Sequence, residues 1–165
     1  MDAAAWGLIG TLVGAAASIG TTWIANTFSF RMHSDKQQEE RLEKAKEFQR
    51  TTLLDLQEAL YDAIRLTARA HHEDFMAYKS GTEWGKGRLT DEVSAGLLAV
   101  NRRVSILIER VENTELRAAV KAFTVQMTHL TRQTEKDEAE LLLEAVTHQF
   151  SALVEKLGTV LRSYY

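Results

Sequence analysis

The sequence predicts an all-α protein with a single N-terminal transmembrane helix, a long charged stalk helix and an antiparallel four-helix bundle. Three observations support this fold class. The 165 residues include no proline, the residue that breaks helix interiors. Alanine, leucine, glutamate, lysine and arginine, which favour helices, dominate the composition. Apolar residues recur at spacings of three and four along most of the C-terminal two thirds.

Residues 1–30 are predicted to form a membrane anchor. Residues 3–30 carry no charged side chain, and a helix needs roughly 20 such residues to cross a bilayer core. Trp6 and Trp23 lie near the two ends, roughly 25 Å apart along a helix, which is close to the separation of two membrane interfaces. Arg31 then begins the charged region. We expect these three residues to act as membrane-interface anchors.

Two other interpretations of this segment are weaker. A cleaved signal peptide begins with a positively charged region, whereas residues 1–5 contain no lysine or arginine. A buried helix of a soluble protein is the second alternative. It draws support from the small number of large aliphatic residues, which makes insertion into a bilayer only modestly favourable.

The positive charges predict the orientation of the span. Six basic residues lie within about 20 residues of its C-terminal end and none precedes it. They are Arg31, Lys36, Arg41, Lys44, Lys46 and Arg50. The positive-inside rule then places the N-terminus outside and the rest of the chain in the cytoplasm. We therefore expect a single-pass protein of the cell inner (cytoplasmic) membrane.

Small residues within the span are regularly spaced. Gly10, Gly14 and Ser18 lie four apart, so they share one helix face on which two backbones can approach closely. This spacing predicts self-association of the span and hence a homo-oligomer. Small residues are also common in spans that do not associate, which is the simpler interpretation.

Residues 31–52 are predicted to be a charged helical stalk. From residue 34 to residue 50 nearly every side chain is polar or charged, and the apolar exceptions are Leu42, Ala45 and Phe48. A helix of this kind is solvated or forms the thin seam of a coiled coil.

Residues 53–165 are predicted to be a cytoplasmic four-helix bundle. The long first helix continues to about Lys79, and the glycine-rich stretch SGTEWGKGR follows as a loop. Three further helices begin at residues able to cap them, namely Thr90 or Asp91, Asn113 or Thr114, and Thr134. Their apolar stripes are Val93, Leu97, Val100, Val104, Leu107 and Val111; Leu116, Val120, Phe123, Met127 and Leu130; and Ala139, Leu142, Val146, Phe150, Leu153, Leu157 and Val160.

The histidines are the natural place to look for a metal site. The stretch AHHEDF, residues 70–75, holds two histidines and two carboxylates, but helical neighbours point about 100° apart and do not converge on one ion. Glu144 and His148 share a helix face and are a weak candidate for joining His71 at a metal. A solvated polar face is the favoured interpretation, so we predict no metal ligands.

No catalytic motif is present. The sequence lacks a nucleophile elbow, a phosphate-binding loop, a zinc-protease helix and a dinucleotide fingerprint. We predict no catalytic activity, no cofactor and no small-molecule substrate. The net charge of −3 argues against nucleic-acid binding. Trp84, in the glycine-rich loop, is a candidate partner contact, and its packing onto the bundle end is the alternative.

The layout resembles that of bacterial proteins that combine one N-terminal span, a charged helical stalk and a small helical domain. The resemblance covers the architecture and implies no site residues. The span, the stalk and the bundle together favour a membrane-anchored helical protein-interaction or scaffolding module whose partners are the bilayer, further copies of itself and another protein. The alternative is a holin-like or channel-like effector that assembles through its glycine-rich span. A metal-binding bundle is a third hypothesis.

Overall fold

The structure is a computed structural model that describes the backbone of residues 3–165 and the side chains of residues 36–165. Over this part of the chain it contains four helices and no strand, which confirms the all-α prediction and is consistent with a helical bundle. The helices are α1 (Ala3–Lys79), α2 (Asp91–Arg110), α3 (Thr114–Leu130) and α4 (Lys136–Arg162). The chain divides into two compact units, Met1–Ala45 and Lys46–Tyr165, and the second unit contains the bundle.

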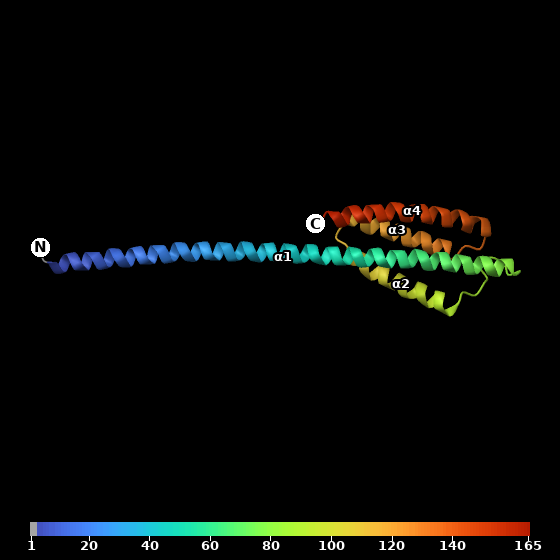
Figure 1. Ribbon diagram of the computed structural model, residues 1–165, viewed down its shortest axis with the longest axis horizontal. Helices are drawn as coiled ribbons and strands as arrows, with labels where there is room; N and C mark the ends of the chain where they lie inside the picture. Colours follow the sequence, from blue (N-terminus) through green and yellow to red (C-terminus); the bar gives the residue numbers. More distant parts are fainter. Residues whose placement is uncertain (1–2) are drawn as a thin grey trace. The chain divides into compact units, whose positions relative to one another are not determined.

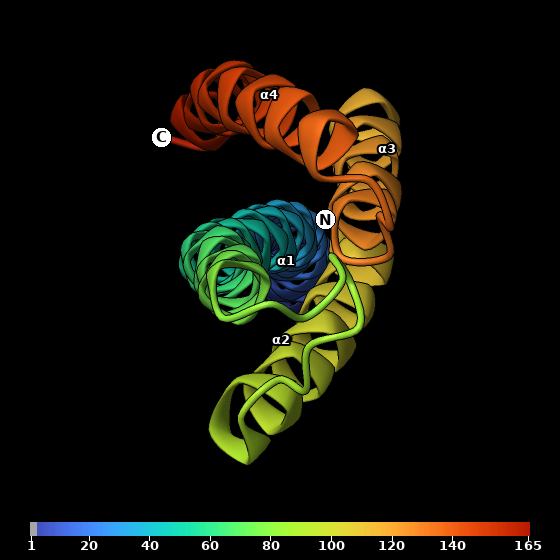
Figure 2. The same ribbon diagram turned by 90° about the vertical axis from the view of Figure 1, so that its right-hand side faces the viewer.

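Within Lys46–Tyr165, successive helices run in alternating directions (Figure 1). The helix α3 packs against both α2 and α4, whereas α2 and α4 do not approach each other closely. Seen along the bundle, α2, α3 and α4 form a curved layer, and the part of α1 within this unit lies on its inner side (Figure 2). The core of the bundle therefore lies between α1 and this layer.

The predicted apolar stripes form that core. Most of their residues are buried, and the exceptions are Leu97, Leu142, Phe150 and Val160, which are half-buried. Phe123 is fully buried, and its ring lies 5.7 Å from that of Phe150 between centroids. Burial of such side chains contributes roughly 1.5–3 kcal/mol each, so this packing dominates the stability of the bundle.

The helix starts agree with two of the three predicted caps. The side chain of Thr90 accepts a hydrogen bond from the Val93 backbone N–H, and that of Asn113 accepts one from Leu116. The prediction for α4 is wrong, because its N-cap is Glu135, which makes no side-chain capping bond. Acidic residues in the first turn favour this helix end through its dipole instead.

The loop after α1 lies close to the start of α4. Gly85 adopts a positive φ of +71° and lies so close to the 133–134 backbone that an added Cβ would meet the Gln133 carbonyl oxygen at 2.6 Å. The loop therefore packs against Gln133 and Thr134. Next to this contact, the backbone of Glu135 is extended, with φ of −110° and ψ of 126°, and α4 begins at Lys136.

The helix α1 enters the bundle core at Gln49. This side chain is buried, and its amide nitrogen donates to the Arg110 carbonyl at 3.0 Å while its oxygen accepts from the Glu112 backbone N–H at 3.1 Å. Arg110 is the last residue of α2, and Glu112 lies in the turn that leads to α3. Thr52 is also buried, whereas Leu42 and Phe48 are exposed. The first contacts of the bundle thus lie about one turn before residue 53.

Several sequence predictions fall outside the described side chains. They are the membrane span at residues 1–30, the interface anchors Trp6, Trp23 and Arg31, and the association face of Gly10, Gly14 and Ser18. Among residues 36–165, no helix has a stretch long and apolar enough to cross a bilayer.

Candidate functional site

Trp84 is packed inside the bundle. Its side chain is only 5% exposed, and its ring lies 5.1 Å from that of His71 and 6.0 Å from that of Tyr78 between centroids. The burial of Trp84 agrees with the alternative interpretation, in which the loop packs onto the end of the bundle. The exposure that a partner anchor requires is therefore not present at Trp84.

Within the polar stretch at residues 70–75, Glu73 forms hydrogen bonds with the residue that caps α2. The Glu73 carboxylate accepts hydrogen bonds from both the backbone N–H of Thr90, at 2.8 Å, and its hydroxyl, at 2.9 Å. Arg69, one turn earlier, donates two hydrogen bonds to the Glu92 carboxylate at 2.8 and 3.0 Å. These contacts tie the end of α1 to the start of α2, so they account for much of the charge in this stretch.

His71 and Asp74 border a small cavity of about 10 Å³ beneath Trp84. Burial lowers the pKa of His71, which the nearby carboxylates of Glu140 and Asp74 partly offset. Burial also raises the pKa of Asp74. Both shifts disfavour the charged forms. The cavity is too small for an organic ligand, so these residues do not form a binding pocket.

The weak metal candidate is not assembled. Tyr61 packs against Phe150, and Glu140 lies near His71, so α1 and α4 are aligned in opposite directions. In that alignment His148 lies about eight residues from the level of His71, or about 12 Å along α4. Among the described residues, no group of three or more histidine, aspartate or glutamate side chains lies where it could hold a metal ion.

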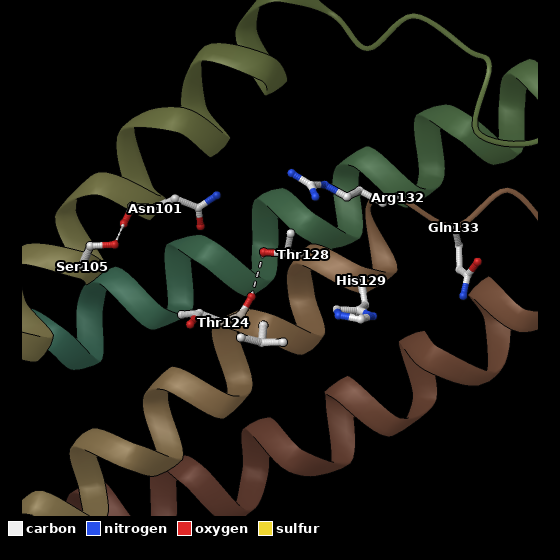
Figure 3. Close-up of a pocket in the computed structure, with 8 residues that line it drawn as sticks. Asn101, Ser105, Thr124, Thr128, His129, Arg132 and Gln133 are labelled. Atoms are coloured by element: carbon white, nitrogen blue, oxygen red, sulfur yellow. Dashed lines mark hydrogen bonds between the residues drawn. The ribbon is translucent and has the colours of Figure 1, made fainter.

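A hollow lies between α2 and α3. We call it the α2–α3 groove, and it has a volume of about 520 Å³. Asn101 and Ser105 contribute from α2, and residues of α3 and of the turn after it form the opposite wall (Figure 3). The full lining is Asn101, Ser105, Thr124, Val125, Thr128, His129, Arg132 and Gln133.

The groove exists because α2 and α3 diverge. Near their connecting turn, Lys121 of α3 pairs with Glu109 of α2 at 2.7 Å. From there the helices separate toward the other end of the bundle (Figure 2). The side chains that line this widening gap do not close it, and most of them are polar.

The chemistry of the groove is uneven along its length. Three wall hydroxyls already donate to carbonyls of their own helices, namely Ser105 to Asn101, Thr124 to Lys121 and Thr128 to Thr124. No carboxylate is part of the lining, and Arg132 supplies its positive charge. The groove thus has a neutral polar wall and a basic end.

Exposed aliphatic side chains border the groove. Val125 is 56% exposed within it, and Leu98 is 75% exposed on the adjoining surface of α2, which shares Asn101 with the groove. Sequence analysis missed both residues because they lie off the apolar stripes. The available signal was an aliphatic residue on the polar face of an otherwise amphipathic helix.

No family model, curated protein or solved structure matches the chain. The function must therefore be argued from the residues of this chain alone.

Proposed function

We propose that the protein is a membrane-anchored helical interaction or scaffolding module that self-associates and has no catalytic activity. One observation carries the proposal. An uncharged run at residues 3–30 is followed directly by a one-sided basic flank, and the same helix, α1, continues into the bundle. The span anchors the chain in the inner membrane with its N-terminus outside, and residues 31–52 act as the stalk that joins it to the cytoplasmic domain.

The bundle is the part that binds another protein. Support comes from the α2–α3 groove, which has exposed aliphatic residues beside it. Exposed apolar surface in a rim of polar groups is typical of protein-interaction sites. Self-association is assigned to the span, where Gly10, Gly14 and Ser18 lie on one helix face.

The absence of cysteine from the sequence makes a direct topology test available. Single cysteines would be placed at Asp2 and at the exposed Leu141 and treated with a membrane-impermeant thiol reagent in intact cells. We expect labelling of Asp2→Cys at once and of Leu141→Cys only after the membrane is permeabilised. Recovery of the chain in the soluble fraction, or the reverse labelling pattern, contradicts the proposed anchoring.

Crosslinking in the intact membrane tests association. We expect crosslinked oligomers of the native chain and their loss in a Gly10→Leu, Gly14→Leu double variant, with an Ala15→Leu, Ala16→Leu variant as control. The holin-like or channel-like alternative rests on the same glycines. It predicts that the native chain increases membrane permeability and that the double variant does not, so unchanged permeability in both removes that alternative.

A further inference from the structure

We infer that the α2–α3 groove receives an amphipathic helix of another protein, with acidic residues at the end of that helix that meets Arg132. This inference rests on the proposed function, since it names the partner class of an interaction module. The geometry, the exposed aliphatic residues and the charge of the groove each contribute to it.

The shape of the groove suits a short helix. Its α3 wall extends from Thr124 to Arg132, which is about 12 Å along the helix axis. The groove is open to solvent along this length (Figure 3). A small-molecule site encloses most of its ligand, whereas a helix lying between two others buries only one face. About two turns of a partner helix span the wall.

Apolar contact is available at the sides of the groove. Leu98 and Val125 are exposed although each has a hydrophobic side chain, and Leu89, Ala95 and Leu97 extend the surface beyond Leu98. A helix placed between α2 and α3 would cover Val125 directly and reach Leu98 at the wide end. Removal of these side chains from water would favour binding.

The charge of the groove selects the partner. The lining has no carboxylate, and Arg132 takes part in none of the ion pairs found between described residues. Two acidic residues of α2 already have basic partners, Glu109 with Lys121 at 2.7 Å and Asp91 with Arg88 at 3.5 Å. A guanidinium group binds carboxylates in a two-pronged arrangement, so an acidic residue on the incoming helix completes the site.

A second copy of this chain fits the groove poorly. Its α2, α3 and α4 helices already bury their apolar faces in their own core. Residues 36–48 carry four acidic and four basic side chains, so this part of the stalk offers no net negative charge. The occupant that the groove favours is therefore a helix of a different protein.

The test uses the full chain in nanodiscs of zwitterionic lipid and two synthetic 15-residue helical peptides. The peptides share apolar residues at spacings of three and four, and they differ in carrying three glutamates or three lysines at one end. Fluorescence anisotropy would measure binding. We expect the acidic peptide to bind more tightly than the basic one, by roughly fivefold for each charge contact.

Two matched variants locate the charge effect. Arg132→Glu should reverse the preference between the peptides, whereas Arg102→Glu, at an exposed position of α2 that is not part of the groove lining, should leave it unchanged. Equal binding of both peptides, no binding of either, or the same effect from Arg102→Glu would overturn the inference.

The aliphatic contribution has its own control. Leu98→Asp and Val125→Asp should each weaken binding of the acidic peptide by roughly tenfold. Leu141 is 69% exposed on α4, and Leu141→Asp should leave this affinity unchanged. Circular dichroism would confirm that all three fold. A change in oligomer size caused by Leu98→Asp or Arg132→Glu would assign the groove to a second copy and refute the partner-helix inference.

The outcomes separate this inference from the proposed function. If the chain is anchored and crosslinks to a protein but does not distinguish the two peptides, only the groove assignment fails. If the chain is not anchored in the membrane, the proposed function fails whatever the peptides do.

Discussion

The helix α3 packs differently against its two neighbours, α4 on one side and α2 on the other. On one flank α3 and α4 lie close together along much of their length, with Phe123 and Phe150 in contact across the core. On the other flank α2 and α3 are close only near their connecting turn. The start of α2 makes polar contacts with α1, such as those of Arg69 and Glu73, and buries Val93. The α4 flank is thus a packed core, and the α2 flank keeps an accessible groove.

This difference predicts where the bundle tolerates change. Apolar packing contributes more to stability than exposed ion pairs, each of which is worth about 0–1 kcal/mol. Substitutions in the packed core should unfold the domain. Substitutions in the groove should alter binding and leave the fold intact.

The largest effect is expected for Phe123→Asp. Phe123 is fully buried, so the variant would place an unpaired carboxylate in the core and leave a cavity around it. We expect a loss of more than about 4 kcal/mol, enough to unfold the bundle. Thermal unfolding followed by circular dichroism would measure this. A variant that retained the helical signal and its melting temperature would contradict the assigned core.

Val125→Asp is the matched control on the same helix. Val125 lies two residues along α3 and is 56% exposed in the groove. We expect its substitution to change the free energy of unfolding by less than about 0.5 kcal/mol. Equal destabilisation by both variants would mean that the two flanks of α3 do not differ as described.

The second largest effect is expected for Gly85→Ala. The residue has a positive φ, and the added Cβ would meet the Gln133 carbonyl oxygen at 2.6 Å. We expect a loss of about 2–4 kcal/mol, from backbone strain and from displacement of the loop. Gly81→Ala is the control, since its φ is +96° but no atom lies within 4 Å. It should lose only about 1 kcal/mol. Urea unfolding of both variants would show whether the contact with residue 133 matters.

An intermediate effect is expected for Gln49→Ala. This change removes both hydrogen bonds to the α2–α3 turn and leaves the Arg110 carbonyl and the Glu112 N–H without these partners. We expect a loss of about 2 kcal/mol. Gln126→Ala, at an exposed position of α3, should lose less than about 0.5 kcal/mol. A Gln49→Ala variant as stable as the native chain would show that the turn does not depend on α1.

Periodicity predicted the helices and their buried faces because an apolar stripe reports which side of a helix faces the core. It did not predict the groove, because the angle between two helices depends on how side chains interlock at their contact. The role of Gln49 was also not predicted, because in the sequence a buried glutamine next to a charged stalk looks the same as a solvated one. The close approach of Gly85 to Gln133, almost fifty residues later in the chain, was also not predicted. Long-range contacts of this kind leave no local pattern.

The smallest effect concerns the pH dependence contributed by His71 at the end of the bundle. Burial lowers its pKa, so the unfolded chain takes up a proton more readily than the folded chain. The resulting stabilisation is complete above the unfolded pKa of about 6.5 and is lost as pH falls through it. Asp74 has the opposite sign, because its raised pKa lowers stability as pH rises above its ordinary range.

His71→Gln should therefore flatten the stability profile between about pH 7 and pH 5. We expect a change below about 1 kcal/mol, because His71 is only partly buried and solvent screens its charge. Melting temperatures of the variant and of the native chain, measured across this range, would test the prediction. An unchanged slope in His71→Gln would mean that the Trp84 end of the bundle accepts the charged imidazole without loss. The end of the bundle where polar contacts join α1 and α2 would then tolerate an added charge better than the packed core between α3 and α4.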